Sequence, residues 1–227
     1  MILSLHQPQY LAWIGYFHKI LKSDIFVFLD NVQYKKREYQ NRNRIRTKSG
    51  VQWLTVPVVH SSDRFIRIKD VLIDNYQDWP AKHWKAIYLN YSRSPYFKEY
   101  SDFFHDLYTR QWERLVDLNI YIIKGINAFL NINTDIYLES ELGINNKKTS
   151  RIIDICRRLE ADTYLSGIGG KAYLEEGLFI DVGIKLKYQK FSLSQYPQRY
   201  RPFIPNLSIL DLLFNCGKES FKILKEC

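Results

Sequence analysis

The most constraining feature of this sequence is the stretch from Asp24 to Arg46, where a short apolar run is followed at once by a polar tract. The run 25–29, Ile-Phe-Val-Phe-Leu, contains no polar residue, which is typical of a strand buried on both faces of a parallel sheet. Ligands of such sheets bind beyond the carboxyl ends of the strands. The sequence therefore places Asp30, Asn31 and the residues after them where a binding site is expected.

The tract that follows this strand is basic, with Glu38 as the single acid between residues 35 and 46. Arginine and amide side chains offer paired hydrogen bonds, and arginine favours phosphate and carboxylate groups. A polar, anionic ligand is the prediction. We assign substrate-binding roles here to Asn31, Gln33, Tyr34, Arg37, Asn41, Arg42, Asn43 and Arg44.

The order of the expected elements favours an α/β fold. A strand at 2–6, a break at Pro8, a helix at 11–21 and the strand at 25–29 form a βαβ unit. Further strands are expected at 51–59, 135–140, 161–165 and 184–191, and helices at 149–159, 207–214 and 220–224. Residues 65–73 fit a hairpin or edge strands. We predict one α/β domain over 1–227, with a Rossmann-like, mostly parallel sheet flanked by helices and an embedded, aromatic-rich helical subdomain at about 80–130.

Composition limits the class of protein. The chain has 227 residues and a net charge of +9, which fits a nucleic acid, a membrane surface, a phosphorylated small molecule or simply a basic surface. It has no apolar run near the roughly 18 to 20 residues that a membrane span needs. The first residues do not resemble a signal peptide, and the three cysteines form no CxxC pair. A reduced, cytoplasmic protein is expected.

Three polar clusters follow the ends of expected strands, and parallel neighbours would bring them to one rim. The first is His6 and Gln7 with Tyr10, and the second is the tract after Asp30. The third consists of Ser166, Gly167, Gly169 and Gly170 with Tyr173. A glycine-rich turn between strand and helix suits phosphate, although SGIGG is neither GxGxxG nor a P-loop.

Proton transfer is assigned to His6 or Asp30, which would act as general base. The alternatives are a structural hydrogen bond for His6 and a cap on the turn for Asp30. Ring stacking is assigned to Tyr10, Trp13 or Tyr34, and His60 is a further substrate-binding candidate. The spacing of histidines and carboxylates indicates no metal site, no nucleophile has an activating partner, and the cofactor is left open.

Three segments together resemble the WbqC-like protein family: HQPQYLAWIGYFHKILKSDIFVFLDNVQYKKREYQNRNRIRTKSGVQWLTVPV, YLSGIGGKAYL and FIPNLSILDLLFNCG. The resemblance spans nearly the whole chain, with Ala12 where members commonly have a second proline. It implies a place among bacterial O-antigen and other surface-polysaccharide genes. A weaker likeness is to nucleotidylyltransferase-type Rossmann folds, but Trp13-Ile14-Gly15-Tyr16 lacks both histidines of the HxGH motif.

The resemblance implies an enzyme of surface-polysaccharide biosynthesis, and the polar residues at the strand ends favour a nucleotide-linked sugar as its substrate. The expected reaction is transfer of an acyl or aminoacyl group to an amino sugar. One alternative is a non-catalytic protein that binds the same sugar nucleotide or serves as a scaffold. Another is an RNA-binding protein, although the basic tract has no known module signature. The oligomeric state is left open.

Overall fold

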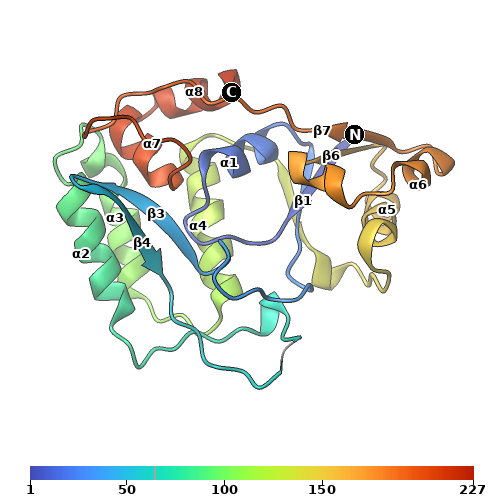
Figure 1. The fold of residues 1–227 in the computed structure, drawn as a ribbon, viewed down its shortest axis with the longest axis horizontal. Coiled ribbons are helices and arrows are strands. Elements are labelled where there is room, and N and C mark those ends of the chain that lie inside the picture. Colours follow the sequence, from blue (N-terminus) through green and yellow to red (C-terminus); the bar gives the residue numbers. More distant parts are fainter. Residues whose placement is uncertain (64) are drawn as a thin grey trace.

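The computed structural model describes residues 1–63 and 65–227, and five parallel strands form its main sheet (Figure 1). In chain order the strands are β1 (Ile2–His6), β2 (Ile25–Phe28), β5 (Asp135–Leu138), β6 (Thr163–Ser166) and β7 (Lys185–Tyr188). Their order across the sheet is β5-β2-β1-β6-β7, and each neighbouring pair is parallel. The predicted α/β fold with a mostly parallel sheet is confirmed.

The apolar run of strand β2 is buried on both faces of the main sheet. Successive side chains of a strand point to opposite faces. Phe26 and Phe28 enter one hydrophobic cluster, whereas Ile25 and Val27 enter another on the opposite face. All four residues are buried, so the prediction of a strand covered on both faces is confirmed.

Helices cover both faces of the sheet. On the Ile25 side lie α5 (Lys148–Arg158) and α6 (Glu176–Asp181). The other cluster draws residues from α1 (Ile14–Leu21), α2 (Trp79–Tyr91), α3 (Phe97–Thr109), α4 (Leu115–Phe129), α7 (Ile209–Cys216) and α8 (Glu219–Glu226). Within 1–63 and 65–227, no helix combines the length and the apolar character needed to cross a membrane.

A separate antiparallel hairpin replaces the expected third strand of the sheet. Strand β4 is Gly50–Thr55 rather than 51–59, and it pairs with β3, Arg42–Thr47. The second half of the basic tract is therefore a strand. The charges of β3 obscured its period of two, in which Asn43 and Ile45 are buried and Arg42 and Arg44 are partly exposed. Arg46 departs from this alternation because it is also buried. The hairpin lies beside α2, away from β6 and β7 (Figure 1).

Three other expectations need correction. The segment 65–73 forms neither a hairpin nor edge strands. It contains a short 3-10 turn, Ile68–Asp70, and isolated bridges to residues 33, 58 and 114. The helix expected from residue 11 begins at Ile14, because Leu11 has a left-handed φ of 45° that a helix excludes. The strands expected at 135–140 and 184–191 are limited to β5 and β7.

The side of the sheet on which successive strands are added changes at β1. From β1 the chain passes through α1 to β2 on one side, while β6 lies on the other side of β1. Such a switch point opens a crevice at the carboxyl ends of the two central strands. The candidate site is found there.

Candidate functional site

A cleft in two adjoining parts opens at the carboxyl ends of β1 and β6, and we call it the rim cleft. The inner part has a volume of about 330 Å³ and the outer part about 640 Å³. The parts share His6, Lys19, Gly167 and Gly169. The inner part adds Leu5, Gln7, Leu29, Tyr164, Ser166, Gly170 and Tyr173, and the outer part adds Trp13, Gly15, Tyr16, Ile168, Gln189, Lys190, Phe191, Ser192 and Cys227.

The rim cleft brings together two of the three predicted clusters. His6 and Gln7 come from the end of β1, and Trp13 precedes α1. Ser166, the glycines and Tyr173 come from the end of β6 and the turn after it. They meet because β1 and β6 are parallel neighbours, with Ser4 opposite Leu165.

His6 is a neutral hydrogen-bonding group in this cleft. Burial and the nearby charge of Lys19 lower its pKa to about 3. Its Nδ1 lies 3.1 Å from the carbonyl oxygen of Gln7, so Nδ1 carries the proton and donates it to that carbonyl. The ring also packs edge-on against Tyr16 at 5.0 Å. The unprotonated Nε2 is therefore an acceptor with a fixed orientation.

Lys19 is the functional candidate that the sequence analysis missed. It lies on α1, where residues 14–20 are all buried, and its Nζ donates to the carbonyl oxygen of Leu5 at 3.0 Å. Burial lowers its pKa to about 7. A lysine within an apolar helix, IGYFHKIL, was the available signal, because buried lysines are rare. At neutral pH this amine is present in both its neutral and charged forms, which suits proton transfer.

The turn after β6 leaves space for a ligand at two of its glycines. A Cβ on Gly167 or Gly169 would meet nothing within 4 Å, so side chains there would enter open space. A Cβ on Gly170 would lie 2.1 Å from the Oγ of Ser166, so glycine is needed there for close packing. The turn is a short 3-10 segment, Ile168–Ala172.

The lining of the rim cleft favours an anionic ligand. Lys19 and Lys190 contribute positive charge, and no aspartate or glutamate side chain is among the described lining residues. No group of three or more metal-ligating side chains was found in 1–63 and 65–227.

Asp30 and Asn31 lie outside this cleft. The carboxylate of Asp30 accepts from the backbone N–H of Ser140 at 2.9 Å and from its hydroxyl at 2.5 Å, which links the ends of β2 and β5. Asn31 accepts from Arg67 at 2.8 Å. The carboxylate of Asp30 therefore has a structural contact, although it bonds to Ser140 rather than to the turn after its own strand. Its catalytic role stays a prediction.

Tyr10, Asn41 and Asn43 are buried and hold loops together. The amide of Asn43 donates to the carbonyl of Leu11 at 2.9 Å, and that of Asn41 donates to the carbonyl of Val56 at 2.8 Å. Tyr10 has no exposed surface. Its ring therefore has no face left for the ligand stacking that the sequence suggested.

The hydroxyl of Tyr10 belongs to a buried chain of polar groups. It lies 2.8 Å from Nδ1 of His83 and 2.6 Å from the hydroxyl of Tyr108. The backbone of Thr55 also hydrogen-bonds the imidazole, and burial lowers the pKa of His83 to about 4. His83 therefore stays neutral, and its Nδ1 accepts a hydrogen bond from the hydroxyl of Tyr10.

The remaining predicted residues fall in two other places. Arg42 and Arg44 lie over Trp53, at 4.5 and 5.7 Å from its ring centre, and the backbone carbonyl of Arg37 accepts from Arg42. Gln33, Tyr34 and His60 line a cavity of about 620 Å³ beside Lys35 and Lys36. The three predicted clusters do not share one rim, because Arg42 and Arg44 lie on the β3–β4 hairpin, which is separate from the main sheet.

Comparison with known proteins assigns the chain to a family. A family model described as the WbqC-like protein family matches residues 7–223. The chain belongs to this family. A member from Mycobacterium tuberculosis (strain ATCC 25618 / H37Rv), "Uncharacterized protein Rv1507c", is 35% identical over 226 residues, which cover 99% of this chain and 97% of the relative. No solved structure matches the chain. The resemblance to the WbqC-like family is confirmed.

The lowered pKa values of three histidines predict a loss of stability in acid. Burial lowers the pKa of His6 to about 3 and those of His18 and His83 to about 4, below the ordinary 6.5. The unfolded chain thus binds protons that the folded chain does not, and stability present above pH 6.5 is lost as the pH falls toward 4. We expect about 1–2 kcal/mol per histidine between pH 7 and 5 in urea unfolding.

His83→Gln tests this assignment, with the exposed His60→Gln as its control. The first variant should lose about a third of the wild-type pH dependence, and the control should keep all of it. An unchanged slope in His83→Gln would contradict the assignment.

Proposed function

We propose that this member of the WbqC-like family is a cytoplasmic transferase of bacterial surface-polysaccharide biosynthesis. It acts on a nucleotide-linked sugar and transfers an acyl or aminoacyl group to the amino group of that sugar. The observation that carries the proposal is the pairing of neutral His6 with Lys19, whose pKa is about 7, in a cleft at the switch point of a parallel sheet. The absence of acidic side chains among the described lining residues supports a phosphate-bearing ligand.

In the proposed reaction the sugar amine attacks the carbonyl carbon of an activated acyl donor of the thioester class. The new C–N amide bond forms, the C–S bond breaks, and the thiolate leaves. Neutral Lys19 takes the proton lost by the amine and returns one to the thiolate. His6 accepts a hydrogen bond at Nε2 and orients the sugar.

The three cysteines fit a reducing compartment, because Cys156, Cys216 and Cys227 are all free thiols. Burial raises the pKa of the Cys156 thiol to about 12. That thiol is unreactive, so a cysteine nucleophile at this position has no support.

A thermal-shift screen tests the ligand class. Wild-type protein is heated with sugar nucleotides, free nucleotides, acyl-coenzyme A donors and short RNA. One class of sugar nucleotide should raise the melting temperature, since a ligand at a thousandfold excess over its dissociation constant stabilises by about 4 kcal/mol. Gly169→Val should abolish the shift by filling open space in the rim cleft.

Gly177→Val is the matched control. A Cβ at Gly177 also meets nothing within 4 Å, and Gly177 does not line the rim cleft, so the shift should persist. A shift that survives Gly169→Val would place the ligand elsewhere. Salt-sensitive RNA binding without any small-molecule shift would overturn the proposal. Sugar-nucleotide binding without acyl transfer from any donor would favour the non-catalytic alternative.

A further inference from the structure

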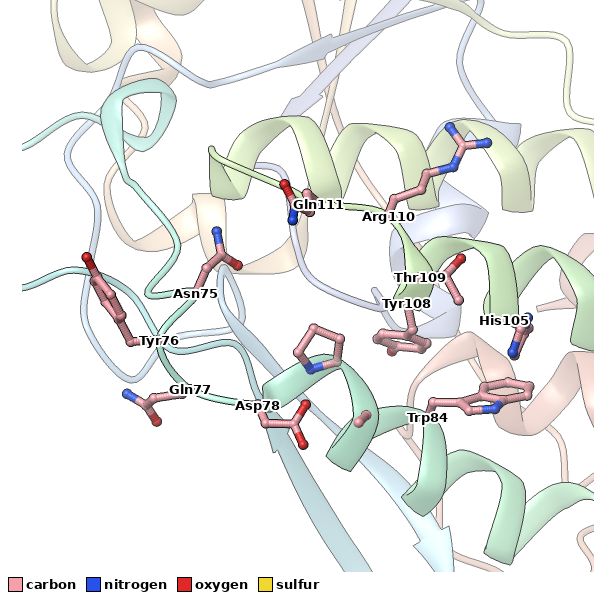
Figure 2. A pocket seen from close by; sticks show the side chains of 12 residues that line it. Asn75, Tyr76, Gln77, Asp78, Trp84, His105, Tyr108, Thr109, Arg110 and Gln111 are labelled. Atoms are coloured by element: carbon pink, nitrogen blue, oxygen red, sulfur yellow. The ribbon is translucent and has the colours of Figure 1, made fainter.

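A second cavity lies between α2, α3 and the loop before α2, away from the rim cleft, and we call it the helical cavity (Figure 2). Its volume is about 630 Å³, which lies within the usual range of small-molecule sites. It shares no lining residue with the rim cleft. No step of the proposed reaction involves the helical cavity.

One end of the helical cavity is aromatic. In Figure 2 the rings of Trp84, Tyr108 and His105 gather at this end. His105 meets Trp84 edge-on at 5.4 Å, Phe97 stacks on Trp84 at 6.1 Å, and Tyr108 lies tilted to it at 6.5 Å. The hydroxyl of Tyr108 is held by Tyr10. The half-buried Trp84 ring is therefore fixed in orientation before any ligand arrives.

The other end is polar and carries groups that are not engaged. Asp78 occupies the N-cap position of α2, where an aspartate usually bonds to the helix, yet its side chain makes no capping hydrogen bond. The amide of Gln111 likewise has no hydrogen-bond partner among the described residues, whereas the amide of Asn75 donates to the carbonyl of Trp112 at 2.8 Å. A carboxylate and an amide are thus available to hydroxyl groups of a ligand.

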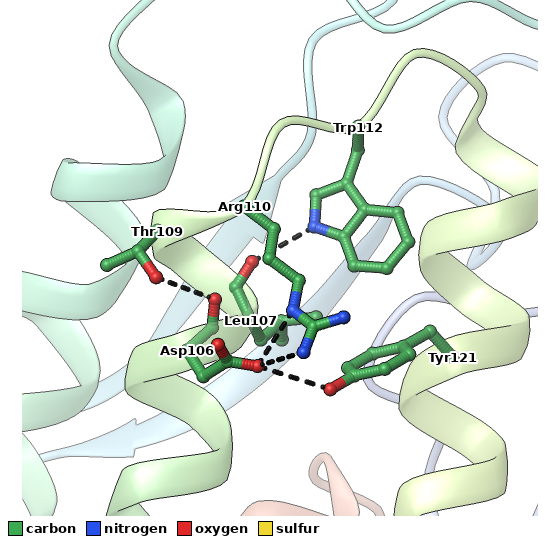
Figure 3. Close-up of polar contacts among 6 residues, drawn as sticks. All are labelled: Asp106, Leu107, Thr109, Arg110, Trp112 and Tyr121. Carbon is green, nitrogen blue, oxygen red and sulfur yellow. Dashed lines mark hydrogen bonds and ion pairs between the residues drawn. The ribbon is translucent and has the colours of Figure 1, made fainter.

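The helical cavity does not suit an anion. Arg110 is the only lysine or arginine among its described lining residues, and Figure 2 shows its side chain directed away from the aromatic end. Figure 3 shows the reason: two guanidinium nitrogens contact the carboxylate of Asp106 at 2.8 and 2.7 Å. The guanidinium also lies 4.8 Å from the ring centre of Tyr121. Its charge is already balanced by Asp106, so a phosphate would meet only the carboxylate of Asp78.

We propose that the helical cavity binds an uncharged sugar ring. A pyranose has one apolar C–H face, which would lie on Trp84, and hydroxyl groups around its edge, which would bond to Asp78 and Gln111. The rim cleft and the helical cavity thus differ in ligand chemistry, since one presents lysines and the other a free carboxylate. This inference does not rest on the proposed transferase function, because it concerns other residues.

The test is ¹⁹F NMR of the full chain labelled with 5-fluorotryptophan. The chain has five tryptophans, and the resonance of Trp84 is assigned by its loss in Trp84→Phe. The probes are methyl glycosides of glucose, galactose, mannose, N-acetylglucosamine and 6-deoxyhexoses, with inorganic phosphate and uridine diphosphate as charged comparisons. A neutral glycoside should shift this resonance saturably, with a dissociation constant of about 1–10 mM for a ligand of this size.

Two substitutions at exposed positions test whether the glycoside binds in the helical cavity. Ala81→Phe places a ring in the cavity from an exposed position, and Asp78→Ala removes the free carboxylate. Asp78→Ala should weaken binding by about tenfold or more, since a hydrogen bond to a charged group is worth at least that factor. Ala81→Phe should weaken binding by about tenfold or more because its ring occupies the space of the ligand. Trp53→Ala, which removes an exposed tryptophan on the hairpin, should leave binding unchanged.

Three results would overturn the proposal: no saturable shift at Trp84 with any glycoside, a shift produced by uridine diphosphate but not by glycosides, or binding that is undiminished in Ala81→Phe. Because the readout is at Trp84, none of these results depends on whether the rim cleft binds a sugar nucleotide.

Discussion

Lys19→Met is expected to stabilise the fold while it reduces turnover by about 10²- to 10⁴-fold, the usual contribution of a general base. The stability gain arises because burial disfavours the charged amine and lowers its pKa to about 7. Loss of the hydrogen bond to the carbonyl of Leu5 offsets part of this gain. A net gain of about 1–2 kcal/mol at pH 6 is expected in urea unfolding.

The difference in stability between Lys19→Met and the wild type should depend on pH, and this dependence identifies the buried amine as its cause. Between pH 7 and 10.5 the unfolded chain binds a proton at Lys19 that the folded chain does not, so wild-type stability rises with pH in this window. The advantage of Lys19→Met should therefore be complete below pH 7 and decrease up to pH 10.5. In the wild type, kcat/KM should rise as the pH passes through about 7.

Lys22→Met is the matched control, because Lys22 lies at the end of the same helix with an exposed side chain. It should change neither stability nor turnover appreciably. Destabilisation of Lys19→Met at every pH, with a constant difference from wild type, would show that Lys19 is only a structural donor.

Asp211→Leu should destabilise the fold by about 3–5 kcal/mol. Asp211 on α7 has no exposed surface, and burial raises its pKa. Its carboxylate accepts hydrogen bonds from Tyr91 at 3.1 Å, Tyr196 at 2.8 Å and Gln198 at 2.7 Å. Leucine would leave the hydroxyls of Tyr91 and Tyr196 buried without an acceptor, whereas Gln198 would keep its bond to the carbonyl of Ile204. Each bond to a charged group is worth about 1.5–3 kcal/mol.

This carboxylate joins parts of the chain that are far apart in sequence. Tyr91 lies on α2, and Gln198 lies in the irregular segment before α7, where its amide also exchanges hydrogen bonds with the backbone of Ile204. Asp102→Ala, at an exposed position on α3, is the control and should change stability by less than about 0.5 kcal/mol. The measurement is the urea midpoint, and a change below 1 kcal/mol for Asp211→Leu would contradict the role given to this network.

Half of the candidate site was predictable from strand ends. The apolar run of β2 and the polar residues after β1 and β6 indicated a parallel sheet, and parallel strands bring their carboxyl ends to one edge. His6 and the turn from Ser166 to Gly170 meet at that edge as predicted. The arginines of β3 do not, because Arg42 and Arg44 belong to a hairpin whose charges hid its alternation.

By itself the sequence determined the fold class, the family and the residues that end each central strand, because these depend on local pattern and on segments read along the chain. Only the tertiary structure decided which polar residues face a ligand. Lys19 enters the rim cleft because α1 packs across β1, and Asp30, Asn41 and Asn43 turn inward to satisfy backbone groups between elements. The helical cavity also depends on how α2 and α3 pack. Such contacts join residues that are distant in sequence, and no local pattern specifies them.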